Sequence, residues 1–429
     1  MSRPTRTLAA SSVLVFALLT FLSLNWHSHR PKFTYHSEIW GDRAGYHVYL
    51  PALVDYGFDP MQFPAGIDQR TGNGFALDSL SGKVVTKYTC GVAILRLPFY
   101  LLGMLFRAAD DPGGPGFTLA DHAMVDVAAA FYCTLGLTLL LLTLRRRYPQ
   151  LTVAWSLLAI LTGTNLLFYA IGDSGMSHVY SFFLFAAWTY LIAKSLRSTI
   201  NASSSLMLGT VAGLIVLVRP TNVLFLPLPI LCLGGLDVFN RMRDAALFNT
   251  TNIVSAFIGG LVIWTPQMAY WTYAFGSPVA WSYGQEGFPY LLEPRLLQFW
   301  FAPYNGLFVY TPLLLSILLL SPLFVRSIGV RVATWIALLG VSYICASWFA
   351  WTFGCSFGSR NFVEYAALFS FPVCEVLGTT HRYKTMVRAL VIACCLYTLK
   401  LTLSCSNCWF GDVWDWPMFR ALLFGPFMV

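Results

Sequence analysis

Long apolar runs, separated by short polar segments, recur along the whole chain. The first, residues 8–26, follows Arg3 and Arg6 and holds about 19 apolar or small residues, enough to cross a bilayer as a helix. Signal-peptide cores are shorter, and no clear small-x-small cleavage pattern follows this run. We therefore interpret it as a membrane anchor.

The composition is that of a membrane protein. Of the 429 residues, 57% are hydrophobic and only 11% are charged, whereas soluble proteins carry about 25% charged residues. The formal net charge of +8 comes from basic residues in short clusters between apolar runs, the pattern of the positive-inside rule. We therefore predict a polytopic membrane protein with no nucleic-acid partner.

About ten further apolar segments are candidate membrane spans. They lie near residues 121–144, 150–171, 177–196, 204–219, 221–236, 252–275, 307–325, 332–352, 362–379 and 387–403. Together with the first run they predict an all-α membrane protein, a single polytopic domain over residues 1–429 with about eleven transmembrane helices.

One orientation gathers the basic loops on the N-terminal side of the membrane. These loops hold Arg3 and Arg6, "RRR" at 145–147, Lys194 and Arg197, Arg241 and Arg243, Arg326 and Arg331, and "HRYKTMVR" at 381–388. Since cytoplasmic loops carry the excess of Lys and Arg, we predict a cytoplasmic N-terminus. The tail after about residue 404 is then extracytoplasmic, in a multi-pass protein of the inner (plasma) membrane.

The stretch 91–106 does not fit this alternation, because counting it as a span would move "RRR" to the wrong side. It contains Arg96 and Pro98, and we interpret it as an interfacial helix against the outer leaflet. The first outer loop then covers residues 27–120 and carries juxtamembrane helices. The ten cysteines leave the redox compartment open, including whether Cys405 and Cys408 form a disulfide.

The unusual polar residues fall almost entirely on the predicted outer face. A charge at the mouth of a helical bundle costs a few kcal/mol unless it is paired or hydrated, so this concentration predicts a functional site. The segments are "EIWGDRAGYHVYLP" (38–51), "KYTCG" (87–91), "GDSGMSHVYSF" (172–182), "VRPTN" (218–222), "WSYGQEGF" (281–288), "FAPYNGLFVYTP" (301–312) and "GCSFGSRNFVEY" (354–365).

Each of these candidates also has a structural interpretation. Arg219 ends an apolar run, so it either extends to the lipid headgroups or binds a phosphate. His178 is a hydrogen-bonding or a catalytic residue, and Glu286 is a solvated turn acid or a ligand-binding one. Arg360 and Glu364 have the spacing of an ion pair on a helix, which is the alternative to substrate contact.

Asp42 is the strongest candidate, because the chain returns to apolar sequence within a turn of it. Its neighbour Arg43 is a cation, and an opposite charge within a few Å lowers the pKa of a carboxylate. We therefore expect Arg43 to keep Asp42 ionised. Glu38 is the only other acid close to it in this loop.

Several of these segments resemble the GT-C class of membrane glycosyltransferases. The resemblance rests on the N-terminal span, the loop opening with an acid and "GYHVYLPAL", "KYTCGVAILRLPFYLLG", and the "LVRPTN" end of the fifth span. It is closest to uncharacterised bacterial members related to protein O-mannosyltransferases and lipid A aminoarabinose transferases. "QMAYWTYAFGSPVAWSYGQEGF" and "FAPYNGLFVYTP" resemble that uncharacterised group in particular.

The resemblance implies inverting transfer of a sugar from a polyprenyl-phosphate donor, on the outer face of the membrane, to a lipid, glycan or protein acceptor. By position Asp42 would be the catalytic base. This chain departs from the better known relatives, which carry an adjacent acidic pair where it has Asp42-Arg43.

The chemistry of such a transfer needs a base for the acceptor hydroxyl and cations for the departing phosphate. Besides the base Asp42, the predicted substrate-binding residues are Glu38, Arg43, Tyr46, Lys87, His178, Arg219, Glu286 and Arg360. The sequence indicates no metal ligand, and it leaves the cofactor and any metal requirement open. A transporter or flippase of lipid-linked sugars, or an inactive partner subunit, are the alternatives.

Overall fold

The computed structural model describes residues 3–235, 249–379, 382–405 and 412–427, together with residues 240 and 243. Arg241, His381 and Cys408 lie outside the described residues. Cys405 is described and is a free cysteine, so it forms no disulfide.

The chain is mostly helical, with 66% of it in helices. The helices of the N-terminal half are α1 (Arg3–Ser28), α2 (Asp42–His47), α3 (Tyr49–Val54), η1 (Pro60–Gln62), α4 (Ile67–Arg70), α5 (Gly91–Gly103), η2 (Met104–Phe106), α6 (Leu119–Leu144), α7 (Gln150–Gly163), α8 (Leu166–Ile171), α9 (His178–Ser195) and α10 (Ala202–Val218). Those that follow are η3 (Pro220–Phe225), α11 (Leu228–Gly234), α13 (Thr250–Phe275), α14 (Leu296–Phe301), α15 (Leu307–Tyr310), α16 (Pro312–Phe324), α17 (Ile328–Ile336), η5 (Ala337–Val341), α18 (Ser342–Ala346), η6 (Arg360–Phe362), α19 (Ala366–Leu377), α20 (Lys384–Ser404) and α21 (Trp416–Phe424).

Five helices within the described residues are long and apolar enough to cross a membrane. They are Leu8–Ser28 of α1, Leu119–Leu144, Thr250–Phe275, the continuous Ile328–Ala346, and Lys384–Ser404. The expectation of about eleven spans is therefore wrong by this measure. The other predicted segments do contain helix, but most of their helices are shorter than the roughly 20 residues that a 30 Å hydrocarbon core requires.

Helix-breaking residues explain several of these short helices. Pro220 cannot continue α10 and disfavours the helical conformation of the residue before it. Arg219 is accordingly extended, with φ −153° and ψ 120°. α7 ends at Gly163, and α8 begins only at Leu166. Apolar content alone does not reveal such breaks.

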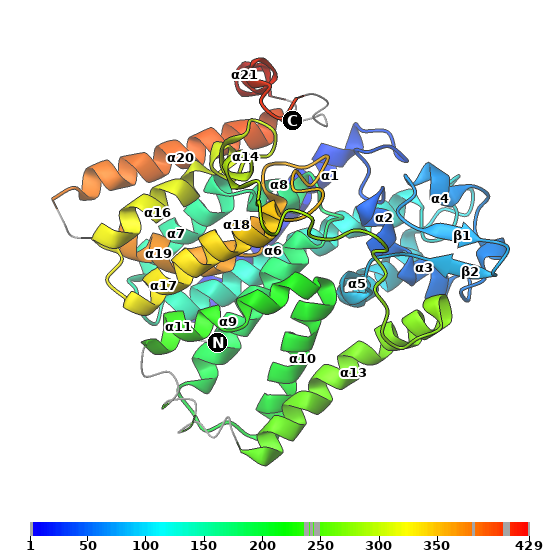
Figure 1. Cartoon of the computed structure of the whole chain (residues 1–429), viewed down its shortest axis with the longest axis horizontal. Coiled ribbons are helices and arrows are strands. Elements are labelled where there is room, and N and C mark those ends of the chain that lie inside the picture. Colours follow the sequence, from blue (N-terminus) through cyan, green and yellow to red (C-terminus); the bar gives the residue numbers. More distant parts are fainter. Residues whose placement is uncertain are drawn as a thin grey trace.

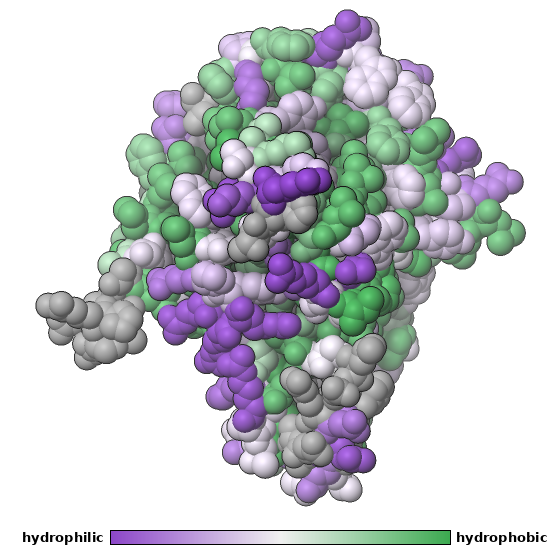
Figure 2. All heavy atoms as spheres, turned by 90° about the vertical axis from the view of Figure 1, so that its left-hand side faces the viewer, coloured by the Kyte–Doolittle hydropathy of each residue, from purple (hydrophilic) through white to green (hydrophobic). Residues whose placement is uncertain are grey.

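Large apolar side chains cover much of the outer surface. Leu14 of α1, Phe257 of α13 and Leu396 of α20 are more than 60% exposed. Figure 2 shows apolar residues spread over one face, with hydrophilic clusters between them. Extended exposed apolar surface marks contact with lipid or protein. Together with the five candidate spans, it indicates a multi-pass helical membrane protein.

Helices α10 and α13 pack closely through small residues and lie side by side at the lower edge of Figure 1. Gly209 and Gly213 of α10 form a G-x-x-x-G pattern. A Cβ at Gly209 would lie 1.8 Å from the carbonyl oxygen of Ala256, and one at Gly259 would lie 2.2 Å from that of Leu206. The glycines therefore allow direct backbone contact, as in many membrane helix pairs.

The predicted first outer loop, residues 27–120, folds into a lobe beside the bundle (Figure 1). Its own hydrophobic cluster includes Ile39, Phe63, Phe75 and Phe117. It also contains an antiparallel hairpin of β1 (Ala76–Asp78) and β2 (Lys83–Val85), in the register Ala76↔Val85, Leu77↔Val84 and Asp78↔Lys83. The prediction of an all-α fold is thus wrong at this hairpin.

The stretch 91–106 forms α5 and η2, but its arginine does not face a lipid surface. Arg96 is 2% exposed. Its Nε donates to the Tyr180 hydroxyl at 2.8 Å, and its Nη2 donates to the carbonyl oxygens of Ser174 and Gly175. The interfacial interpretation is therefore wrong for this side chain, which holds the 172–177 loop against α5.

The predicted orientation can be tested with two exposed positions, Leu80 at the hairpin turn and Arg146 in the basic loop. With the N-terminus cytoplasmic, a membrane-impermeant maleimide should label Leu80→Cys in intact cells, and Arg146→Cys only after permeabilisation. The described free cysteines are buried or half-buried, which keeps background labelling low. The reverse pattern would contradict the orientation.

Candidate functional site

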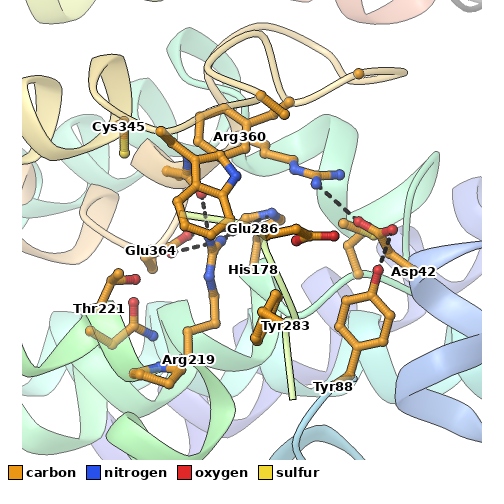
Figure 3. Close-up of a pocket in the computed structure, with 18 of the residues that line it drawn as sticks. Asp42, Tyr88, His178, Arg219, Thr221, Tyr283, Glu286, Cys345, Arg360 and Glu364 are labelled. Carbon is orange, nitrogen blue, oxygen red and sulfur yellow. Dashed lines mark hydrogen bonds and ion pairs between the residues drawn. The ribbon is translucent and has the colours of Figure 1, made fainter. Parts of the chain in front are cut away.

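A cavity of about 690 Å³ opens between the lobe and the bundle. Its lining comes from the segments 40–46, 87–88, 173–178, 219–224, 281–288, 341–355 and 360–365. Eight of the nine predicted site residues line it: Asp42, Arg43, Tyr46, Lys87, His178, Arg219, Glu286 and Arg360. The fold therefore brings together polar segments that are far apart in sequence (Figure 3).

The charged groups of the cavity form ion pairs that join different segments. The pairs are Asp42–Arg360 at 2.9 Å, Asp173–Arg43 at 2.9 Å, Glu286–Lys87 at 2.5 Å and Glu364–Arg219 at 3.4 Å. Buried charges are stable only when paired and hydrogen-bonded. The two more buried pairs, Arg43–Asp173 and Arg219–Glu364, therefore fix parts of the cavity wall relative to each other.

Asp42 lies at the start of α2, and both of its carboxylate oxygens are hydrogen-bonded. Oδ1 accepts from the Tyr88 hydroxyl at 2.5 Å, and Oδ2 accepts from Arg360 Nη2 at 2.9 Å. Gly45 makes this contact possible, because a Cβ there would lie 2.2 Å from the Tyr88 ring. The Asp42 side chain is still 36% exposed, so a molecule in the cavity can reach its remaining lone pairs.

These partners keep Asp42 ionised. Burial raises the pKa of its carboxyl, but the charge of Arg360, the Tyr88 hydroxyl and the charge of Lys87 together lower it below the usual value. The expected direction of the shift is confirmed. The expected cause is wrong, since Arg43 pairs with Asp173 instead.

Arg219 lies in a second cluster, to the left of Asp42 in Figure 3. Its Nη1 is 2.9 Å from His178 Nδ1 and 3.4 Å from Glu364 Oε1, and its Nη2 donates to Asn361 Oδ1. His178 also pairs with Glu364, at 2.9 Å. Arg219 thus lines the cavity, and its guanidinium is held there by protein side chains.

Arg360 and Glu364 do not form the ion pair that their spacing suggested. Arg360 begins η6, a short 3₁₀ segment, and turns toward Asp42. Glu364 turns toward Arg219 and His178. The two side chains thereby belong to different groups of ion pairs in the cavity.

Lys87 and Glu286 form the most exposed of these pairs, with side chains 37% and 26% exposed. The ammonium group of Lys87 lies 5.5 Å from the Tyr88 ring centre and 5.6 Å from that of Tyr283. Such exposed pairs contribute little to stability. Because both side chains are partly exposed, an anion that enters the cavity can replace Glu286 as the partner of Lys87.

Part of the cavity wall is apolar. It is formed by side chains of η3, α18 and the segment after α18, namely Leu224, Ile344, Trp348, Phe349 and Phe353. Leu224 and Phe349 are more than 40% exposed at the surface. The cavity therefore suits an amphiphilic molecule, with a polar end among the ion pairs and an apolar end on this wall.

Glu38 is the predicted site residue that does not line the cavity. It is 1% exposed, accepts from Lys32 Nζ, and lies 2.8 Å from His122 Nδ1. Burial raises the pKa of the Glu38 carboxyl, but the hydrogen bond with His122 and the charges of His27 and Lys32 lower it by more. The net shift of the pKa is therefore downward. The prediction that Glu38 contacts substrate is wrong for this geometry, because its side chain points toward α6.

Tyr88, Asp173, Asn361 and Glu364 also belong to the cavity and were not among the predicted site residues. Each lies within a polar segment that the sequence did single out. The pattern could have suggested Asp173, an acid in an apolar context. Nothing in the pattern distinguishes the tyrosine that contacts Asp42 from the other tyrosines of the chain.

The five candidate spans indicate a helical, multi-pass membrane protein, and a charged, aromatic-lined cavity lies between its lobe and its bundle. No family model matches the chain, and neither the curated proteins nor the solved structures include a match.

Proposed function

We propose that the protein is a membrane glycosyltransferase that moves a sugar from a polyprenyl-phosphate donor to a hydroxyl acceptor. The cavity carries this proposal, because it combines an ionised and accessible carboxylate, several arginines and an apolar part of the wall. A polyprenyl-phosphate sugar matches this lining, because its sugar and phosphate suit the charged groups and its hydrocarbon chain suits the apolar wall.

In the proposed reaction Asp42 accepts the proton of the acceptor hydroxyl while the acceptor oxygen bonds to the anomeric carbon. The bond from that carbon to the phosphate oxygen breaks, and its electron pair leaves with the phosphate. A single displacement inverts the anomeric centre. Arg360 and Tyr88 orient the carboxylate for this step.

The departing phosphate gains charge, so it must meet cations. Arg219, Lys87 and Arg360 are the cavity cations that would hold it by charge-assisted hydrogen bonds. The hydrocarbon chain would lie along Leu224 and Phe349. Trp281 also lines the cavity and offers a flat face for the sugar.

We place this reaction on the extracytoplasmic side of the membrane. Cys355, which lines the cavity, is disulfide-bonded, and disulfides persist in oxidising compartments. Where the structure describes them, the basic loops of the predicted cytoplasmic side contribute none of the cavity-lining residues.

The proposal can be tested without knowing the sugar. The protein, purified in detergent, is incubated with a panel of polyprenyl-phosphate hexoses and pentoses and a mixture of envelope glycans and lipids. Release of free polyprenyl phosphate, followed by mass spectrometry, is the expected result. If no donor is consumed with any acceptor fraction, the proposal fails.

Transport of lipid-linked sugars is the second candidate, and the broken helices favour it. α10 is interrupted at Arg219, and the helix Ile328–Ala346 contains the π-helical turn Ala337–Val341. Both breaks border the cavity, as binding sites in transporters often do. Turnover in detergent separates the two functions, since a transporter alone would leave the donor intact.

The pH dependence of transfer should reflect the lowered pKa of Asp42. A carboxylate base is active above its pKa, and this pKa lies below the usual value of about 4. We expect kcat/KM to show no acid-side loss between about pH 8 and pH 5. Tyr88→Phe removes one hydrogen bond that lowers this pKa, so its acid limb should move to higher pH. An unshifted limb would contradict the assignment.

A further inference from the structure

A second group of ionisable side chains is buried where the lobe meets α1 and α6. His27 comes from the end of α1, Glu38 from the lobe, and His122 and Asp126 from α6. All four are at most 2% exposed. They lie outside the cavity, and the proposed reaction uses none of them.

Three of these side chains converge with the spacing of metal ligands. One ligand atom each from His27, Glu38 and Asp126 can be chosen so that all three lie within 4.8 Å of one another. His27 Nδ1 is 3.0 Å from Asp126 Oδ1 and 4.0 Å from Glu38 Oε1. Ligands about 2.1 Å from a tetrahedral cation are about 3.4 Å apart. Shifts of well under an ångström would therefore complete the set.

The cluster also contains buried polar atoms that the protein leaves unsatisfied. Asp126 Oδ2, His27 Nε2 and His122 Nε2 have no hydrogen-bond partner among the described residues. An unsatisfied polar atom in the interior is costly, and a carboxylate oxygen especially so. One oxygen of the Asp126 carboxylate, Oδ2, thus has no hydrogen-bond partner among the described residues, and it lies among side chains of the kinds that bind metal ions.

The neighbours of these side chains orient them as the outer shell of a metal site would. The Ser23 and Ser174 hydroxyls donate to Asp126 Oδ1 at 2.8 and 2.6 Å. His122 Nδ1 lies 2.8 Å from the second oxygen of Glu38. Such contacts fix ligand geometry and raise metal affinity. Lys32, which bonds Glu38 Oε1, is 20% exposed and can turn toward solvent.

We propose that His27, Glu38 and Asp126 bind a divalent transition cation of the zinc type. One imidazole and two carboxylates suit this class better than magnesium, which prefers oxygen ligands alone. The cation would join α1, the lobe and α6. Since Glu38 precedes Asp42 by four residues, it would also hold the segment that carries Asp42.

The full chain, purified in detergent without chelator, should contain one equivalent of metal by plasma mass spectrometry. After treatment with EDTA its thermal midpoint should fall, and Zn²⁺ should restore it while Mg²⁺ at the same concentration should not. Co²⁺ should give the visible absorption of a four-coordinate site. These readouts do not depend on transferase activity, so they separate this proposal from the function proposed above.

Asp126→Asn keeps the size of the side chain and its contacts with the two serines but replaces the ligand. It should weaken Zn²⁺ binding at least about tenfold. The matched control is Glu375→Gln, a carboxylate on α19 that accepts from Tyr148 and the backbone of Arg326. Glu375→Gln should bind Zn²⁺ with the same affinity as the unchanged protein.

His27→Gln provides a second variant if Asp126→Asn does not fold, and it too should lose Zn²⁺ affinity. Purified protein without metal whose stability does not respond to Zn²⁺ would overturn the proposal. So would equal Zn²⁺ affinity in the unchanged protein and either cluster variant, because the metal would then be bound elsewhere, for example by cysteines.

Discussion

Asp42→Asn should insert and bind donor normally while transferring sugar at least about a hundredfold more slowly, the lower range for loss of a general base. Asparagine keeps the shape of the side chain. Its amide oxygen can accept from Arg360 and its NH2 group can donate to the Tyr88 oxygen, but it cannot take up the acceptor proton. The rate of polyprenyl phosphate release at saturating donor is the measurement.

Glu286→Gln is the matched control for Asp42→Asn. It removes a carboxylate from the same cavity at a more exposed position, where the partner is Lys87. Its effect on kcat should be less than about tenfold, because exposed ion pairs contribute little. Undiminished transfer by Asp42→Asn would remove Asp42 as the base and favour the transporter. Glu38→Gln is expected to affect stability instead, since Glu38 does not reach the cavity.

Arg219→Gln should weaken donor binding by about ten- to a hundredfold, which corresponds to the 1.5–3 kcal/mol of a charge-assisted contact. It should also destabilise the fold, by about 3 kcal/mol, because removing one partner of a buried ion pair leaves the other uncompensated. The charge left without its arginine is Glu364, whose side chain is 2% exposed and keeps only its contact with His178 among these partners.

A second substitution separates the two effects of Arg219→Gln. The double variant Arg219→Gln/Glu364→Gln removes both charges, so it should recover stability while donor affinity stays low. Glu364→Gln alone should maintain or raise donor affinity, since a negative charge near the phosphate is gone. Thermal midpoints and equilibrium binding of a polyprenyl-phosphate sugar measure these outcomes. Full donor affinity in the double variant would show that Arg219 does not hold the phosphate.

The local features of this structure could be predicted from the sequence. Each of the predicted spans contains helix, because apolar runs of this length have few other ways to satisfy their backbone in a low-polarity environment. The polar segments of one predicted face also supply most of the cavity lining. What the apolar pattern overstates is helix length, because a break such as that at Arg219 depends on a single Pro and its neighbours.

Pairing between side chains depends on the tertiary structure. Asp42 and Arg360 are 318 positions apart, while Arg43, directly beside Asp42, turns to Asp173. Neighbours in sequence point in different directions on a short helix, so adjacency does not predict the ion pair. The same geometry placed Glu38 and Asp42, four residues apart, in two separate groups of charges.

The sequence by itself thus determined the class of protein and the chemical groups at its site, because hydropathy and residue type are local properties. The tertiary structure alone decided which charges meet, which carboxylate remains accessible in the cavity, and that His27, Glu38 and Asp126 come together. The physical reason is that a charge buried in a helical bundle must find its partner wherever the packing of distant helices places one.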